Sequence, residues 1–179
     1  MKNFNSRRDF IKTSAMVTGG ILAPSFIVPG AYAAPANELK LAVIGCGGRG
    51  TGAVFQAFAT GHPIKLVAMA DAFRDRVDSC YNYITSNKVE ESEGATSALK
   101  TQIDVPESNK FSGFDAYKKA IDLADVVILT SPPGFRPDHL EYAINSNKHI
   151  FCEKPLATDA TGIRKVMGLL EVSKQKKLN

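Results

Sequence analysis

Short apolar runs alternate along the chain with segments whose apolar residues recur at helical spacing. Each run is followed by Gly, Asp, Ser or Glu, and the first is rich in branched aliphatic residues, a pattern typical of buried strands. The predicted strands are residues 39–44, 64–70, 125–130 and 149–152. The predicted helices are residues 51–60, 73–84, 113–121 and 138–146, and a last helix that follows a Thr158-Asp159 cap and has apolar residues at positions 163, 166, 167 and 170.

This alternation of strands and helices predicts an α/β fold with a doubly wound parallel sheet, covered by helices on both faces. Ligands of such sheets bind beyond the carboxyl ends of the strands. A long polar stretch at residues 85–109 interrupts the alternation, and we expect a loop there with a short helix near residues 95–102.

A glycine cluster follows the first predicted strand. Gly45, Gly47 and Gly50 stand at the G-x-G-x-x-G spacing of a strand-turn-helix that holds a dinucleotide. The first glycine permits the tight turn, the second lets the backbone approach a pyrophosphate, and the third lets the helix pack closely on the strand. The spacing alone is a weak signal, because a glycine-rich turn is more often only a turn.

An acidic residue stands where such a motif requires one. Asp71 follows the second predicted strand, 21 residues after Gly50, where a carboxylate can accept hydrogen bonds from ribose hydroxyls. A carboxylate there repels a 2′-phosphate and favours NAD over NADP, although Arg74 is close enough to accommodate the phosphate. The alternative role for Asp71 is the N-cap of the helix that begins at Phe73, and one residue can serve both roles.

The first 38 residues have the character of a leader. Arg7-Arg8 is followed by an apolar pair and then by an uncharged stretch, residues 13–37, that several Gly and Pro residues interrupt. The small-x-small sequence Ala31-Tyr32-Ala33 fits a signal-peptidase site. The pattern resembles a twin-arginine (Tat) signal, which predicts a signal peptide at 1–33, a linker at 34–38 and a domain at 39–179. The alternative is a basic N-terminus with a chance Arg-Arg.

A Tat signal implies an exported or periplasmic protein that meets the Tat machinery and keeps no stable membrane insertion after processing. Because this route carries folded proteins, it suits a cofactor that is loaded before export.

Charge and cysteine content exclude other classes of function. The net charge of +4 comes largely from the leader, which holds four cations and one anion, so no basic stripe is left to follow a nucleic acid. Three cysteines, Cys46, Cys80 and Cys152, form no C-x-x-C pair, which argues against a disulfide framework and a zinc site. We interpret them as thiols in or near the core, and no other set of residues has metal-ligand spacing.

Taken in order, Gly-Cys-Gly-Gly-Arg-Gly at 45–50, Asp71, Thr130-Ser131-Pro132-Pro133, His139 and Glu153-Lys154-Pro155 resemble the Gfo/Idh/MocA oxidoreductases. The resemblance covers about residues 38–175 and is to their N-terminal NAD(P)-binding Rossmann domain. It implies NAD as the cofactor, with NADP as the alternative. It also implies cofactor contacts at Gly45, Cys46, Gly47, Gly48, Arg49, Gly50, Asp71, Thr130, Ser131, Pro132, Glu153 and Lys154.

The resemblance assigns Lys154 the catalytic role of orienting substrate and cofactor and assisting proton transfer, and it assigns Pro155 the shaping of that turn, with a cis bond as one option. From residue type alone, Lys154 beside Glu153 could equally be a surface ion pair. His139 either faces the cleft or is a solvated or capping residue, and His62 and His149 have the character of structural residues.

The implied activity is hydride transfer on a sugar, cyclitol or polyol by a protein that can form a homo-oligomer. The family also implies an NAD-dependent glycoside hydrolase as an alternative, and a non-catalytic dinucleotide-binding module is a third. Members have a second α/β domain that completes the substrate pocket. No such domain is expected within these 179 residues, so we expect the chain to be a fragment that is inactive alone.

Overall fold

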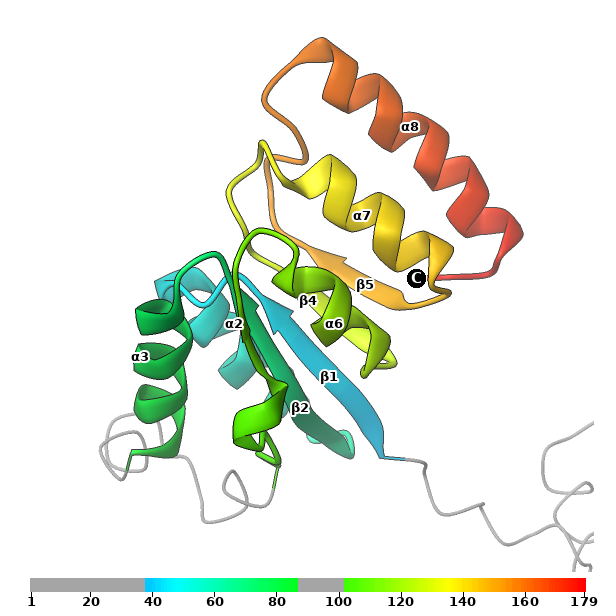
Figure 1. Ribbon diagram of the computed structural model, residues 1–179. Coiled ribbons are helices and arrows are strands. Elements are labelled where there is room, and N and C mark those ends of the chain that lie inside the picture. The colour runs from blue at the N-terminus through cyan, green and yellow to red at the C-terminus, as the bar shows by residue number, and fades with distance from the viewer. Residues whose placement is uncertain (1–37, 87–101) are drawn as a thin grey trace, which may run out of the picture. The chain divides into compact units, whose positions relative to one another are not determined.

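Five parallel strands form one sheet in the order β3-β2-β1-β4-β5 (Figure 1). The structure is a computed structural model that describes residues 38–86 and 102–179. The strands are β1 Leu39–Ile44, β2 Ile64–Asp71, β3 Lys110–Ser112, β4 Val126–Leu129 and β5 His149–Cys152. This order is that of a doubly wound Rossmann sheet, with its switch point between β1 and β4. The predicted fold class is therefore confirmed.

Helices cover both faces of the sheet. They are α2 Gly48–Phe58, α3 Arg74–Thr85, α6 Ala116–Asp122, α7 Arg136–Asn145 and α8 Ala160–Gln175, with a 3₁₀ turn η1 at Glu107–Asn109. Figure 1 shows α2 and α3 on one side of the sheet and α6 and α7 on the other, with α8 beside α7. Asp159 caps α8 as predicted, because its carboxylate accepts the Gly162 N–H at 2.7 Å. The predicted start of α6 at residue 113 is wrong, since Gly113 has a φ of +111° that no helix contains.

The two halves of the core differ in side-chain size. The half under α2 and α3 contains large side chains such as Leu41, Leu66 and Met69. The half under α6 and α7 is built largely from alanines, namely Ala42, Ala68, Ala70, Ala116, Ala120, Ala124 and Ala143. The helices on this alanine face can therefore approach the sheet closely.

An irregularity in β2 keeps its side chains on the right faces. Leu41 pairs with Leu66 but Ala42 pairs with Ala68, so one extra residue, Val67, is inserted in β2. Leu66 and Met69 consequently enter the same half of the core although they are three positions apart. The Val67 carbonyl accepts a hydrogen bond from the Asn109 side chain at 3.0 Å. Neither this irregularity nor the short strand β3 was predicted.

Several expectations lie outside the described residues. The leader at 1–33 and all but the last residue of the linker at 34–38 do so, and so does the short helix near 95–102, apart from residue 102. Within the described ranges, no helix is both long and apolar enough to cross a bilayer, and no three His, Cys, Asp or Glu side chains are grouped to hold a metal ion.

Candidate functional site

A cavity of about 560 Å³ lies at the carboxyl ends of β1, β2 and β4. Gly45, Gly47 and Asp71 line it together with Thr130, Ser131 and Pro132, as expected for the glycine loop and the strand ends. Its remaining wall is mostly aromatic and cationic, from Phe73, Arg76, Phe114, Tyr117, Phe135, Arg136 and His139. The sequence-predicted residues Cys46, Gly48, Arg49, Gly50, Glu153 and Lys154 do not line this cavity.

The three glycines of the loop meet three different constraints. Gly45 has a φ of +97°, and a Cβ there would lie 2.6 Å from the Ser131 nitrogen. A Cβ on Gly50 would overlap the Gly45 carbonyl oxygen, so α2 could not reach the end of β1. A Cβ on Gly47 would meet nothing within 4 Å.

Gly47 is the N-cap of α2, and no side chain caps this helix. Backbone N–H groups at its first turn therefore face a space that a diphosphate can occupy, with the positive end of the helix dipole toward it. We call this space at Gly47 over the N-terminus of α2 the cradle, and it fits the phosphates of a dinucleotide.

Asp71 holds the glycine loop against the end of β2. One carboxylate oxygen accepts the Cys46 N–H at 2.7 Å, and the other accepts the Phe73 N–H at 3.1 Å. The N-cap of α3 is Phe73, so the alternative role of Asp71 as that cap is wrong. A carboxylate has about four acceptor sites, which leaves room for ribose hydroxyls beside the two backbone donors.

Thr130 and Ser131 use their hydroxyls within the protein. The Thr130 hydroxyl lies 2.7 Å from the Gly45 carbonyl and 3.0 Å from that of Ile44, so it fastens β4 to the loop. The Ser131 hydroxyl lies 2.9 Å from Nδ1 of His139.

His139 is a buried residue of the cavity wall and is neither solvated nor a cap. Only 7% of the residue is exposed, and its ring stacks on Tyr117 with centroids 4.1 Å apart. Burial lowers the pKa of His139 to about 4. The imidazole is therefore neutral at pH 7, and its hydrogen bond to Ser131 fixes its orientation.

Arg136 joins two strand-end turns. The residue is 6% exposed, and its guanidinium donates to the carbonyls of Ser131 and Glu153, each at 2.7 Å, and to that of Pro155. This role was not predicted, because an arginine in the first turn of a helix ordinarily points to solvent. The Lys154–Pro155 bond is cis, the option that the resemblance allowed.

Glu153 is paired with Arg49 of α2 rather than with its neighbour Lys154. The Arg49 guanidinium donates through Nε at 2.6 Å and also through a terminal nitrogen. This hydrogen bond holds the pKa of Glu153 below its usual range. Lys154 is exposed and forms no ion pair with another described residue. The surface ion pair considered for Lys154 and Glu153 is therefore wrong.

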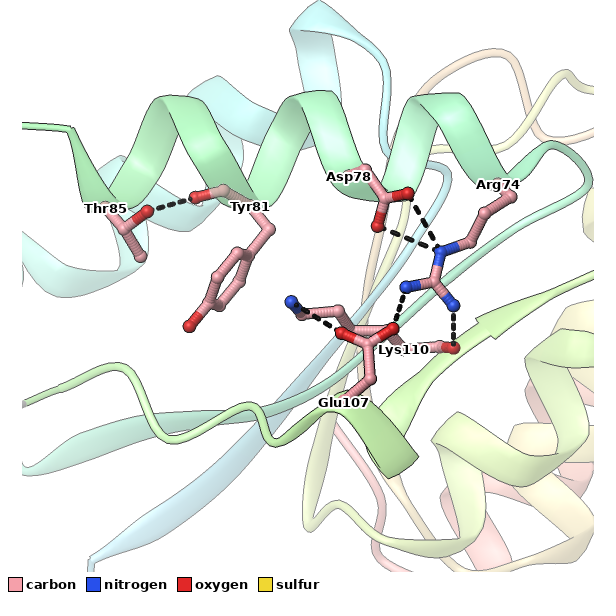
Figure 2. Close-up of polar contacts among 6 residues, drawn as sticks. All are labelled: Arg74, Asp78, Tyr81, Thr85, Glu107 and Lys110. Carbon is pink, nitrogen blue, oxygen red and sulfur yellow. Dashed lines mark hydrogen bonds and ion pairs between the residues drawn. The ribbon is translucent and has the colours of Figure 1, made fainter.

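Arg74 is engaged away from the cavity. Figure 2 shows its guanidinium between Asp78 and Glu107, with Nε 2.9 Å from an Asp78 oxygen. Lys110 joins the same group through Glu107 at 3.1 Å and lies over the Tyr81 ring. Of the two arginines at the start of α3, the one that lines the cavity is instead Arg76, two residues further along the helix.

Aromatic side chains form the part of the site that sequence reasoning missed. Phe114 is 71% exposed and stacks on Phe135, with ring centroids 6.0 Å apart. Phe135 also stacks on the His139 ring, with centroids 6.2 Å apart. Phe73 lies beside Asp71 and is also exposed. Such exposed aromatics at one cavity suit a planar ring. The available signal was position: Phe73 stands shortly after the predicted strand 64–70 and Phe135 shortly after the strand-end residues 130–133, whereas Phe114 falls inside the predicted helix 113–121.

Cys46 stands in the glycine loop, and Cys80 of α3 lines a small cavity with it. Cys46 and Cys80 are buried and Cys152 is half-buried, and all three are free thiols. This confirms the interpretation of the cysteines as thiols in or near the core.

Comparison with known proteins gives one family and a consistent fold. The family described as "Oxidoreductase family, NAD-binding Rossmann fold" (GFO_IDH_MocA) matches residues 39–178. A search of curated protein sequences finds no match.

Similar solved structures include myo-inositol 2-dehydrogenase from Lactobacillus plantarum, with a TM-score of 0.52 and 22% identity over 74% of this chain and 33% of that one. The WlbA dehydrogenase from Bordetella pertussis, solved with NADH and UDP-GlcNAcA, has a TM-score of 0.51 and 17% identity over 79% and 36%. A candidate myo-inositol dehydrogenase from Sinorhizobium meliloti 1021 has a TM-score of 0.50 and 25% identity over 79% and 34%.

The chain spans about a third of the length of these structures. The family match covers nearly all of the described residues and includes every strand of the sheet. The chain thus belongs to the GFO_IDH_MocA oxidoreductase family, of which it carries the NAD-binding Rossmann domain.

Proposed function

We propose that this chain is the nucleotide-binding part of an exported oxidoreductase that moves a hydride between NAD and a sugar, cyclitol or polyol. The observation that carries the proposal is the cradle at Gly47, where the open space over an uncapped helix N-terminus meets the Asp71 carboxylate within one cavity. The family match and the inositol dehydrogenase at 25% identity support the substrate class.

Within this proposal each part of the cavity binds a different part of the cofactor. The α2 N-terminus binds the diphosphate, Asp71 binds the adenosine ribose, and the exposed aromatics pack against the adenine. When bound, the nicotinamide exchanges a hydride with the substrate carbon. Lys154, exposed at the end of β5, is the proposed group that orients the substrate hydroxyl and moves its proton. The ion pair between Arg49 and Glu153 joins the first turn of α2 to the turn that follows β5.

The ribose assignment is tested by comparing two aspartates. We expect Asp71→Ala to weaken NADH binding at least tenfold and NADPH binding less, because the lost carboxylate contacts the ribose hydroxyls only in NADH. Asp78→Ala is the matched control, since Asp78 pairs with Arg74 away from the cavity. Calorimetric titration of both cofactors measures the effect. Equal losses for the two cofactors would remove the ribose role.

A second pair of variants tests which cofactor the site admits. Arg76 lines the cavity and forms no ion pair with another described residue, whereas Arg74 is held by Asp78 and Glu107. We therefore expect Arg76→Ala to reduce NADPH affinity and Arg74→Ala to leave it unchanged. If Arg74→Ala reduced NADPH affinity and Arg76→Ala left it unchanged, the 2′-phosphate contact would belong to Arg74.

A further inference from the structure

Two cysteines from separate elements line the same small cavity at the glycine loop. Cys46 lies in the loop and Cys80 in α3, and the residues are 3% and 2% exposed. The Thr51 hydroxyl lies 3.1 Å from the Cys80 sulfur, and the Cys46 thiol donates to the Ala70 carbonyl at 3.5 Å. We call Cys46 and Cys80 the thiol pair. A disulfide between them would bring the two sulfurs to the S–S bond length of about 2.05 Å.

The two thiols are electrostatically unequal. The neighbouring Cys80, and then burial, raise the pKa of Cys46, whereas the neighbouring Cys46, with help from the Thr51 hydroxyl, lowers the pKa of Cys80. Cys80 is thus the thiol that more readily becomes a thiolate, and Cys46 keeps its proton. A nucleophilic thiolate beside a resolving thiol is the arrangement that favours disulfide formation.

A small oxidant can reach the pair. A second cavity, of about 210 Å³, is lined by both cysteines and by Gly47, Gly48 and Thr51 of the loop and helix. This volume suits a molecule of the size of hydrogen peroxide.

We propose that Cys46 and Cys80 form a reversible disulfide on reaction with hydrogen peroxide, and that this bond lowers the affinity of the glycine loop for a dinucleotide. The Cys80 thiolate attacks peroxide, the O–O bond breaks and a sulfenic acid forms with release of hydroxide. The Cys46 sulfur then displaces the sulfenic oxygen, its proton leaves with that oxygen as water, and the S–S bond closes. The two sulfurs give up two electrons, and one peroxide becomes two waters.

The bond acts on the loop because of where Cys46 stands. Its N–H is held by Asp71 at 2.7 Å, and its neighbour Gly47 accepts the Thr51 hydroxyl at 3.0 Å. Drawing Cys46 toward α3 disturbs both contacts at the point where a diphosphate must approach the backbone. This coupling rests on the proposed dinucleotide binding, whereas the disulfide itself does not.

The test treats the full chain with hydrogen peroxide, blocks remaining thiols and maps tryptic peptides by mass spectrometry. Cleavage places Cys46 in peptide 41–49 and Cys80 in peptide 77–88. We expect these two peptides to be linked, an at least fivefold rise in the Kd for NADH, and recovery of both on reduction. Cys80→Ala should abolish the link and the peroxide effect, and Cys152→Ser should retain both. Circular dichroism establishes that each variant is folded.

The outcomes separate the parts of the argument. Overoxidation of single cysteines, or a link that involves Cys152, would overturn the disulfide. A 41–49 to 77–88 link with unchanged NADH affinity would overturn the coupling. If the reduced protein binds no NADH, the proposed function fails, while the peptide map still decides the disulfide.

Discussion

At the scale of single residues, the glycines of the loop separate binding from folding. Gly47→Val should weaken NADH binding at least tenfold, because the new side chain fills the space that the diphosphate needs. Its melting temperature should change little, since a Cβ there meets nothing within 4 Å. Gly50→Ala is the matched comparison and should cost about 2–4 kcal/mol of stability through its overlap with the Gly45 carbonyl. Retained NADH affinity in Gly47→Val would refute the cradle.

His139 makes stability depend on pH. Its folded pKa of about 4 lies below the ordinary value of 6.5, so between these values the unfolded chain binds more protons than the folded one. Stability is therefore fully present above pH 6.5 and falls as the pH drops toward 4, by up to about 3 kcal/mol. Urea unfolding of the protein and of His139→Gln measures this difference. Parallel stability profiles for the two proteins would contradict it.

Residue identity and spacing predicted part of the site but could not show what each side chain contacts. The roles of Gly45 and Gly50 in the turn and in close packing follow from spacing, because only glycine fits both. The Asp71 bond to the Cys46 N–H and the burial of His139 depend on neighbours that are distant in the sequence. No periodicity encodes such contacts.

At the scale of elements, one arginine of α7 holds two turns in place. Arg136→Met removes the donor for the carbonyls of Ser131, Glu153 and Pro155, two of which are turn residues beyond β5. We expect it to lower the free energy of unfolding by about 2–3 kcal/mol, measured by urea denaturation. Arg164→Met, on the exposed surface of α8, should have little effect. An equal loss in both variants would deny Arg136 this role.

Long apolar elements were predictable and short polar ones were not. β1, β2 and β4 carry runs of branched aliphatic residues that no loop requires. β3 has three residues, only one of them apolar, and becomes a strand only because the edge of β2 is there to pair with it. Tertiary pairing, and not local preference, makes that element.

At the scale of the whole molecule, the proposed export depends on the N-terminal arginines. Changing Arg7 and Arg8 together to Lys should leave the protein in the cytoplasm, because the twin-arginine route reads that pair. Fractionation with an antibody against the Rossmann domain measures the distribution. Lys2→Arg, which leaves the pair intact, should be exported normally. Continued export of the double variant would discard the Tat interpretation.

The unequal halves of the core have a consequence for which mutations the chain tolerates. On the alanine face under α6 and α7 the alanines are buried, so substitutions that enlarge a residue should be the damaging ones. Under α2 and α3, where Leu66 and Met69 fill the space, the damaging substitutions should be those that shrink a residue. The protein should therefore tolerate few substitutions to larger side chains on one side of the sheet and few substitutions to smaller side chains on the other.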